Sequence, residues 1–130
     1  MYLLDTNTLI FFFKDIGNVS NMLLSKSPQN IIIPSIALYE LEVGIAKSNN
    51  PRKRKKQLSD LISQVAIAPF GAKEAEAAAT IRATLESKGT PIGPYDTLIA
   101  GIALSIKATL VTSNTKEFKR IETINIEDWL

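Results

Sequence analysis

Short runs of consecutive apolar residues alternate along the chain with longer segments in which apolar residues recur every three or four positions. The short runs predict strands that are buried on both faces, because polar residues do not alternate within them. The longer segments predict helices. We expect strands at residues 2–4, 31–33, 65–68, 110–112 and 123–126, and helices at 9–13, 18–26, 35–45, 51–64, 71–88, 97–106 and 116–120.

Serine and glycine mark where some of these elements begin and end. Ser35 is expected to cap the helix 35–45, and Gly89 is expected to end the helix 71–88. The helix 35–45 is apolar around much of its circumference, which predicts that it is largely buried. The alternation of strands and helices indicates an α/β fold with a mostly parallel sheet of four or five strands. Helices should flank both faces of this sheet, in a single domain of residues 1–130.

The composition is that of a globular protein, with 45% hydrophobic and 22% charged residues. The chain contains no cysteine and no histidine, which excludes disulfides, thiolate metal sites, Ser-His-Asp triads and catalytic imidazole pairs. A zinc site is disfavoured as well, because zinc rarely binds through carboxylates alone. Carboxylates, hydroxyls, lysines, arginines and hard metals bound through oxygen remain for catalysis.

The first residues do not have the pattern of a targeting segment. Their apolar run 9–13 is much shorter than the ~20 residues needed to cross a bilayer. Asp5 precedes this run, where a secretory signal would carry Lys or Arg. We expect no membrane association, and cytoplasmic residence is the expectation for this chain.

Positive charge is concentrated in one short segment. The formal net charge is +2, from 15 basic and 13 acidic residues. Without the segment 52–56, the remaining chain has 10 basic and 13 acidic residues, a charge of −3. Such a segment can attract the phosphate backbone of a nucleic acid, and a solvated helix face is an equally weighted alternative. The segment comprises Arg52, Lys53, Arg54, Lys55 and Lys56.

Three acidic residues stand where a carboxylate without a function is costly. Asp5 ends a buried strand, Glu40 interrupts a mostly apolar helix, and Asp96 lies in the first turn of a helix made almost entirely of apolar residues. A buried carboxylate needs a counter-charge, hydrogen bonds or a metal ion. Lys and Arg are sparse in these segments, so a hard cation is the simplest partner for all three.

Each of these acids also has a purely structural explanation. Asp5 could cap the helix that follows it, Asp96 could be favoured by its helix dipole, and Glu40 could face solvent. Glu42 points in a different direction from Glu40 and is expected to be an ordinary surface charge. Glu40 is preferred for a site because Gly44, one turn later, leaves open space beside it. All three structural explanations must hold together for the functional one to fail.

Four segments around these acids resemble, in order and spacing, the motifs of PIN-domain nucleases in the form found in VapC-type toxins. The segments are Leu4–Asn7, Tyr39–Gly44, Pro91–Ala100 and Leu110–Phe118, followed by a similar tail at Ile124–Leu130. The resemblance covers essentially the whole chain. It implies a PIN-like fold and a toxic endoribonuclease of a VapBC toxin–antitoxin system. Such an enzyme would hydrolyse RNA phosphodiester bonds with Mg²⁺, or with Mn²⁺ in its place.

The resemblance assigns the metal-binding and catalytic roles to Asp5, Glu40 and Asp96. The fourth position departs from the common form, because Asn114 stands where many members have an acid and Glu117 follows three residues later. On a helical turn these two residues are neighbours. We therefore expect Glu117 to complete the carboxylate cluster, both as a catalytic and as a metal-binding residue, with Asn114 in support. Further supporting positions are Thr6, Asn7 and Thr112; for the two threonines, hydrogen bonding at a strand end is the favoured explanation.

The resemblance also implies partners. A structured, tRNA-like RNA is the expected substrate, a VapB-type antitoxin the expected protein partner, and a homodimer the expected assembly. The basic segment 52–56 and Lys116 are the candidate RNA contacts. The phenylalanines of the first helix and Tyr39 could contact a partner, although core burial explains them equally well.

Two other functions are consistent with the sequence. The residues Asp5 to Thr8 loosely resemble the opening of phosphatases with an aspartyl nucleophile, but Asn7 stands where their second acid belongs. A PIN module that binds RNA or protein without cleaving it is the other alternative. Such modules usually lack site acids, and three are intact here, whereas Asn114 keeps this alternative open.

Overall fold

Five parallel strands form the centre of the computed structural model, which describes residues 1–130. They are arranged in the order β3-β2-β1-β4-β5, and every neighbouring pair is parallel. Leu3, in the central strand, pairs with Ile32 on one side and with Leu110 on the other. The predicted α/β class with a parallel sheet is confirmed. The strands are β1 (Tyr2–Leu4), β2 (Ile31–Pro34), β3 (Ala66–Ala68), β4 (Thr109–Val111) and β5 (Ile126–Glu127).

Seven α-helices connect these strands, and a 3₁₀ turn at Pro28–Asn30 precedes β2. None of the helices is long and apolar enough to cross a lipid bilayer. The helices are α1 (Thr6–Phe13), α2 (Val19–Leu24), α3 (Ser35–Ala46), α4 (Pro51–Ile62), α5 (Ala72–Ser87), α6 (Pro94–Ile106) and α7 (Thr115–Phe118).

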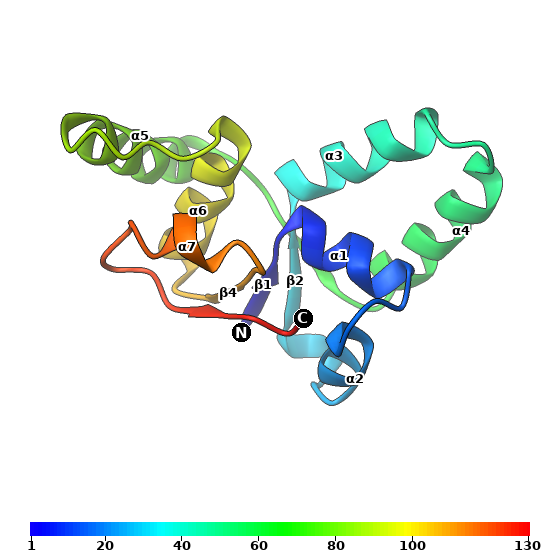
Figure 1. The fold of residues 1–130 in the computed structure, drawn as a ribbon. Coiled ribbons are helices and arrows are strands. Elements are labelled where there is room, and N and C mark those ends of the chain that lie inside the picture. Colours follow the sequence, from blue (N-terminus) through cyan, green and yellow to red (C-terminus); the bar gives the residue numbers. More distant parts are fainter.

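The order of the strands places these helices on two faces of the sheet. The connections from β1 to β2 and from β2 to β3 step across the sheet in one direction, whereas those from β3 to β4 and from β4 to β5 step in the other. Because connections between parallel strands are right-handed, the two groups of helices cover opposite faces. In Figure 1, α1 to α4 accordingly lie on one side of the strands and α5 to α7 on the other.

One continuous core holds the sheet and helices together. It comprises 25 buried hydrophobic residues between Leu3 and Trp129. The ring of Trp129 packs 5.3 Å from the ring of Tyr2, which fixes the C-terminal tail against the start of β1. The central strands are buried on both faces, and this explains why their side chains do not alternate between apolar and polar. Strand residues that are fully buried are Leu3, Leu4, Ile31, Ile33, Leu110 and Val111.

The helix α3 is less buried than its apolar sequence predicts. Only Ala37 and Leu41 are buried, and Tyr39 and Val43 are exposed. Its first residue is Ser35, which does not cap it, because Pro34 occupies the N-cap position and makes no side-chain cap. The expectation of a largely buried, serine-capped helix is therefore wrong. An apolar helix that stays half outside the core has surface available for contacts with other molecules.

The last strand also differs from its predicted position. It was expected at 123–126 but is formed by Ile126 and Glu127, which pair with Leu110 and Val111. The apolar pattern at the end of the chain does not set this register. The pairing with β4 sets it, and that long-range contact is not visible in a local window of sequence.

The helices α5 and α6 cross closely at a glycine. A Cβ atom at Gly101 would lie 2.7 Å from the Cβ of Ala78 and 3.0 Å from its Cα and N atoms. These atoms belong to a helix backbone or adjoin it, so they cannot move aside as the end of a flexible side chain could. Gly44 on α3 is the opposite case, because nothing lies within 4 Å of a Cβ built there.

We expect Gly101→Ala to lower the free energy of unfolding by about 1–3 kcal/mol, because overpacking at the crossing outweighs the roughly 1 kcal/mol that alanine gains over glycine within a helix. Gly44→Ala, in open space, should raise it by roughly 0.5–1 kcal/mol. Urea denaturation followed by far-UV circular dichroism measures both values. Effects of the same sign would contradict the close crossing of α5 and α6.

Candidate active site

The sheet changes its winding direction between β1 and β4. These two strands are neighbours, but the connection that leaves β1 and the connection that reaches β4 run over opposite faces. In open α/β sheets, ligands bind outside the carboxyl ends of the strands at such a switch point. Asp5 directly follows β1, and Thr112 directly follows β4. The first predicted site residue therefore lies at the position that this fold favours for a ligand.

Asp5 caps α1 at this edge of the sheet. It is 4% exposed, and its Oδ1 accepts a hydrogen bond of 3.0 Å from the backbone N–H of Thr8. Burial raises the pKa of Asp5, hydrogen bonds with Thr112 and Thr8 lower it, and the negative charge of Asp128 raises it. The net direction is upward. Capping and a site role are thus compatible for Asp5, because the cap fixes the carboxylate at the switch point.

Glu40 reaches the same edge from α3. Its Oε1 accepts a hydrogen bond of 2.7 Å from Oγ1 of Thr6 in α1. This bond joins two helices and restricts the orientation of the carboxylate. Glu42, by contrast, forms an ion pair with Lys55 of α4, as expected of a surface charge. Two glutamates of one helix therefore have separate environments.

Asp96, Asn114 and Glu117 form the other side of the site. Asp96 lies in the first turn of α6, and Asn114 occupies the N-cap position of α7. Nδ2 of Asn114 donates to Oε2 of Glu117 at 2.8 Å and lies 3.5 Å from Oδ2 of Asp96. One amide group therefore holds the glutamate and reaches the aspartate.

The four predicted carboxylates act on one another electrostatically. The pKa of Asp96 is raised from 3.8 to about 6, first by burial and then by the negative charges of Asp5, Glu117 and Glu40; the hydrogen bond with Asn114 lowers it. None of the four carboxylates forms an ion pair with a lysine or arginine. Like charges gathered in a partly buried place are costly unless a cation shares the site.

The chemistry of these side chains suits a hard divalent metal ion. Carboxylate and amide oxygens are the ligands that Mg²⁺ and Mn²⁺ prefer. No three acidic side chains lie close enough together to hold an ion between them. Mg²⁺ usually takes only one or two direct carboxylates and keeps several waters. The donor chemistry of these side chains and the absence of a counter-charge therefore suit such an ion.

Threonines hold the carboxylates in place. Thr6 contacts Glu40, and Thr112 contacts Asp5 and also accepts a turn hydrogen bond from the N–H of Asn114. Thr8 was not predicted: it is 3% exposed, and its hydroxyl donates to the carbonyl oxygen of Val111 at 3.1 Å. The available signal was a hydroxyl three residues after an acid that ends a strand.

Two other residues depart from expectation. Asn7 is exposed and makes no side-chain hydrogen bond, so nothing in its surroundings connects it with the carboxylates. Asp128, near the end of the chain, acts on the pKa of Asp5 although it was not among the predicted site residues. Its position follows from β5, whose carboxyl end lies at the same edge of the parallel sheet.

The basic segment 52–56 lies in the first half of α4. Two of its five charges are neutralised within the molecule, because Lys55 pairs with Glu42 and Lys56 pairs with Asp60 at 3.0 Å. The segment is therefore not a uniform basic patch.

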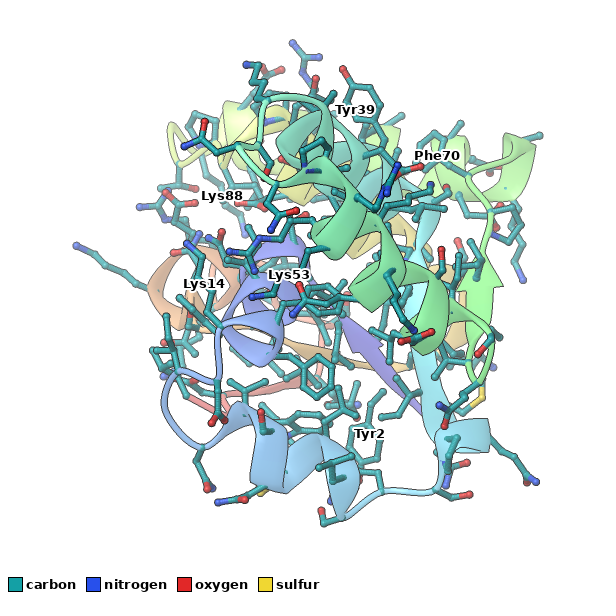
Figure 2. The ribbon with its side chains drawn as sticks, turned by 90° about the vertical axis from the view of Figure 1, so that its right-hand side faces the viewer. Tyr2, Lys14, Tyr39, Lys53, Phe70 and Lys88 are labelled. Atoms are coloured by element: carbon teal, nitrogen blue, oxygen red, sulfur yellow. The ribbon has the colours of Figure 1, made fainter.

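The other three charges of this segment form no ion pair. Arg52 and Lys53 are exposed, whereas Arg54 is half-buried. Figure 2 shows Lys53 near the start of α4 and Lys14 at the end of α1 in one region of the surface. Lys116, on α7 beside Glu117, is also exposed and unpaired.

Comparison with known proteins gives consistent matches over nearly the whole chain. Residues 2–124 match the model of the PIN domain family. The tRNA(fMet)-specific endonuclease VapC of Salmonella typhimurium is 39% identical over 98% of this chain and 97% of its own length. Ribonuclease VapC2 of Rickettsia felis is 37% identical over 99% of this chain and 98% of its own.

A solved structure agrees with the fold as well. It is the structure of VapBC2 from Rickettsia felis bound to a DNA fragment from its promoter. The matching chain is 37% identical and has a TM-score of 0.92, covering 99% of this chain and 98% of the other. The likeness therefore includes the segments that carry all four carboxylates.

The raised pKa of Asp96 predicts a pH-dependent gain in stability when its charge is removed. The folded state binds this proton more tightly than the unfolded state, so ionisation costs stability as the pH rises from about 4 through about 6. Asp96→Asn should therefore raise the free energy of unfolding at pH 7.5, by on the order of 1 kcal/mol after solvent screening. Little or no gain should remain at pH 4. Urea denaturation in EDTA at both pH values measures the effect.

Asp60→Asn is the matched control, because Asp60 is exposed and paired with Lys56. This variant should not gain stability at pH 7.5. A gain for Asp96→Asn that is equal at both pH values would contradict the electrostatic explanation.

Proposed function

This chain belongs to the PIN-domain family, to its VapC ribonucleases, and we propose that it is an endoribonuclease that hydrolyses phosphodiester bonds of structured RNA. The observation that carries the proposal is the gathering of Asp5, Glu40, Asp96 and Glu117 at the switch point of the sheet with no counter-charge. Ribonucleases with this domain generally depend on a divalent metal ion. We propose Mg²⁺, with Mn²⁺ as a substitute.

Asp5 and Asp96 are the proposed direct metal ligands, because they lie at the carboxyl end of β1 and at the facing start of α6. Glu40 and Glu117 would contact the waters of the ion. A bound divalent ion would act as a Lewis acid toward a phosphate oxygen. It would also lower the pKa of a bound water molecule toward neutrality. The four carboxylates thus both attract the ion and define where it is held.

The remaining residues of the site orient these carboxylates. Thr6 fixes Glu40, Asn114 fixes Glu117, and Thr8 and Thr112 fix Asp5. Such contacts keep the carboxylates ready for the ion before RNA arrives, which reduces the reorganisation needed during the reaction. The chain positions the ion and the RNA, and attack by water in line with the leaving oxygen gives 5′-phosphate and 3′-hydroxyl ends.

We propose tRNA as the substrate class, because the Salmonella relative is named for tRNA(fMet) and is 39% identical. RNA in the cytoplasm is then the natural target, and we propose residence there. A single PIN domain is proposed for the chain, since one core cluster runs from Leu3 to Trp129.

The aspartyl phosphatase is not favoured, because Asn7 is exposed and its amide cannot serve as a general acid.

Metal-dependent cleavage of total tRNA by the purified protein tests the proposal. Discrete fragments should appear with Mg²⁺ and be absent with EDTA. Glu40→Gln should lower the cleavage rate by about ten- to a hundredfold, by analogy with the loss of residues that support a metal site. Glu42→Gln, a change of the same kind on the same helix, should remain within a few-fold of the unchanged protein, because Glu42 contacts Lys55 instead of the site.

Tight tRNA binding without cleavage under any metal condition would instead favour a non-catalytic PIN module. Equal losses of cleavage rate for Glu40→Gln and Glu42→Gln would contradict the proposal that Glu40 belongs to the site and Glu42 does not.

We further propose a VapB-type antitoxin as partner and a homodimer as the assembly. The similar VapBC complexes support the antitoxin. The half-exposed apolar helix α3 supports the dimer, with Tyr39 and Val43 on its surface and the exposed Tyr95 of α6 packed against Tyr39 at 5.9 Å between ring centroids. Apolar surface of this kind is a common feature of interfaces between subunits.

Light scattering after size exclusion should give about twice the chain mass of 14.3 kDa. Val43→Glu should shift the protein toward the mass of one chain, because a carboxylate would be buried without a partner in the interface. Leu24→Glu is the control, since Leu24 is 74% exposed but lies on α2. A dimer that persists in Val43→Glu would place the interface elsewhere.

A further inference from the structure

A hollow of about 290 Å³ lies beside the carboxylate cluster, between α1, α3 and α4. Glu40 lines this hollow and belongs to the carboxylate cluster, so the two adjoin at Glu40. Two basic side chains also line the hollow: Lys14, which follows α1, and Arg54 of α4. Ser48, after α3, adds a hydroxyl group, and Gly44 leaves the wall open.

The charges of Lys14 and Arg54 are not neutralised within the molecule. Neither residue takes part in any of the four ion pairs of the structure. Arg54 is half-buried, and its Nη1 donates to Oε1 of Gln57 at 3.2 Å, which orients the guanidinium group along the wall of the hollow. A partly desolvated guanidinium without an anion is unfavourable. An anion in the hollow would remove this cost.

We propose that this hollow binds a backbone phosphate of the RNA next to the phosphate that is cleaved. The inference rests on the proposed function and names the contact that holds its substrate. Arginine offers two parallel N–H donors to phosphate oxygens, and lysine adds a point charge. Because the hollow adjoins the carboxylate cluster at Glu40, a phosphate bound there would belong to the same RNA strand as the bond that is hydrolysed.

The structure thereby separates the members of the basic segment. Lys55 and Lys56 are paired with acids, and Arg52 lies about 160° around the helix from Arg54, at 100° per residue. Arg54 alone of the five lines the hollow. The phosphate contact therefore depends on one arginine of the segment together with Lys14, and Arg52 provides a matched control on the opposite side of the same helix.

Binding of fluorescein-labelled tRNA(fMet), measured by fluorescence anisotropy over a series of salt concentrations, tests this contact. The protein carries Asp5→Asn to prevent cleavage, since asparagine also caps a helix. Arg54→Ala should raise the Kd about tenfold and reduce the slope of log K against log salt by about one. Lys14→Ala should also raise the Kd. Because Lys14 is exposed, this substitution should not unfold the protein. Arg52→Ala should change the Kd less than twofold.

Equal effects of Arg54→Ala and Arg52→Ala on the Kd for tRNA would overturn the proposal. A Kd that neither Arg54→Ala nor Lys14→Ala changes would also overturn it, whether or not these variants alter the binding of a protein partner. Cleavage by the chain with Asp5 intact separates this outcome from failure of the proposed function. If that chain cleaves tRNA, Arg54→Ala should raise KM about tenfold with kcat nearly unchanged, whereas Arg52→Ala should alter neither. If it binds tRNA without cleaving it, the difference between Arg54 and Arg52 in Kd still supports the phosphate contact.

Discussion

Four carboxylates share one edge of the sheet without a lysine or arginine to neutralise them, and the rest of the structure has to hold them there. The energetic cost is visible in Asp96, whose pKa is raised to about 6 by burial and by three neighbouring acids. The fully buried central strands and the apolar body of α6 supply the rigidity that keeps these groups together. Active sites often lower the stability of a protein in this way, because function requires an energetically unfavourable arrangement of charges. A divalent cation offsets the same repulsion, so the feature that destabilises the chain is also what attracts the ion.

Much of this arrangement could be predicted from the sequence because its signals are local. Uninterrupted apolar runs identified the strands, since strands covered on both faces have no polar side to show. Asp5, Glu40 and Asp96 were predicted as site residues because each is an acid in an otherwise apolar segment, and the three lie near enough for their charges to raise the pKa of Asp96. The register of β5 and the exposure of α3 could not be predicted, and the role of Thr8 was missed although its spacing of three residues from Asp5 is visible in the sequence. The register of β5 and the contact of Thr8 both depend on Val111, which is distant in the sequence. The exposure of α3 depends on how much of the helix the core covers.

The amide of Asn114 contacts two of the four carboxylates. An acid at this position would add a further negative charge beside Asp96, whereas Asn114 donates to Glu117 and reaches Asp96 with the same NH₂ group. The hydrogen bond lowers the pKa of Asp96 while the charge of Glu117 raises it. A neutral residue and an acid three positions apart thus act in opposite directions on the pKa of Asp96. The helical turn of α7 makes this possible, because it brings residues i and i+3 to the same face.

The position of the unpaired Arg54 follows from core packing more than from charge. The ion pair between Lys55 and Glu42 connects α4 to α3, but exposed pairs of this kind contribute only about 0–1 kcal/mol. Leu58, four residues after Arg54 and therefore on the same side of the helix, is 1% exposed, and burial of one leucine is worth roughly 1.5–3 kcal/mol. Packing of Leu58 turns Arg54 inward and leaves Arg52 in solvent. A residue used for binding charge is therefore placed by a neighbouring apolar one, which explains why a count of basic residues could not single it out.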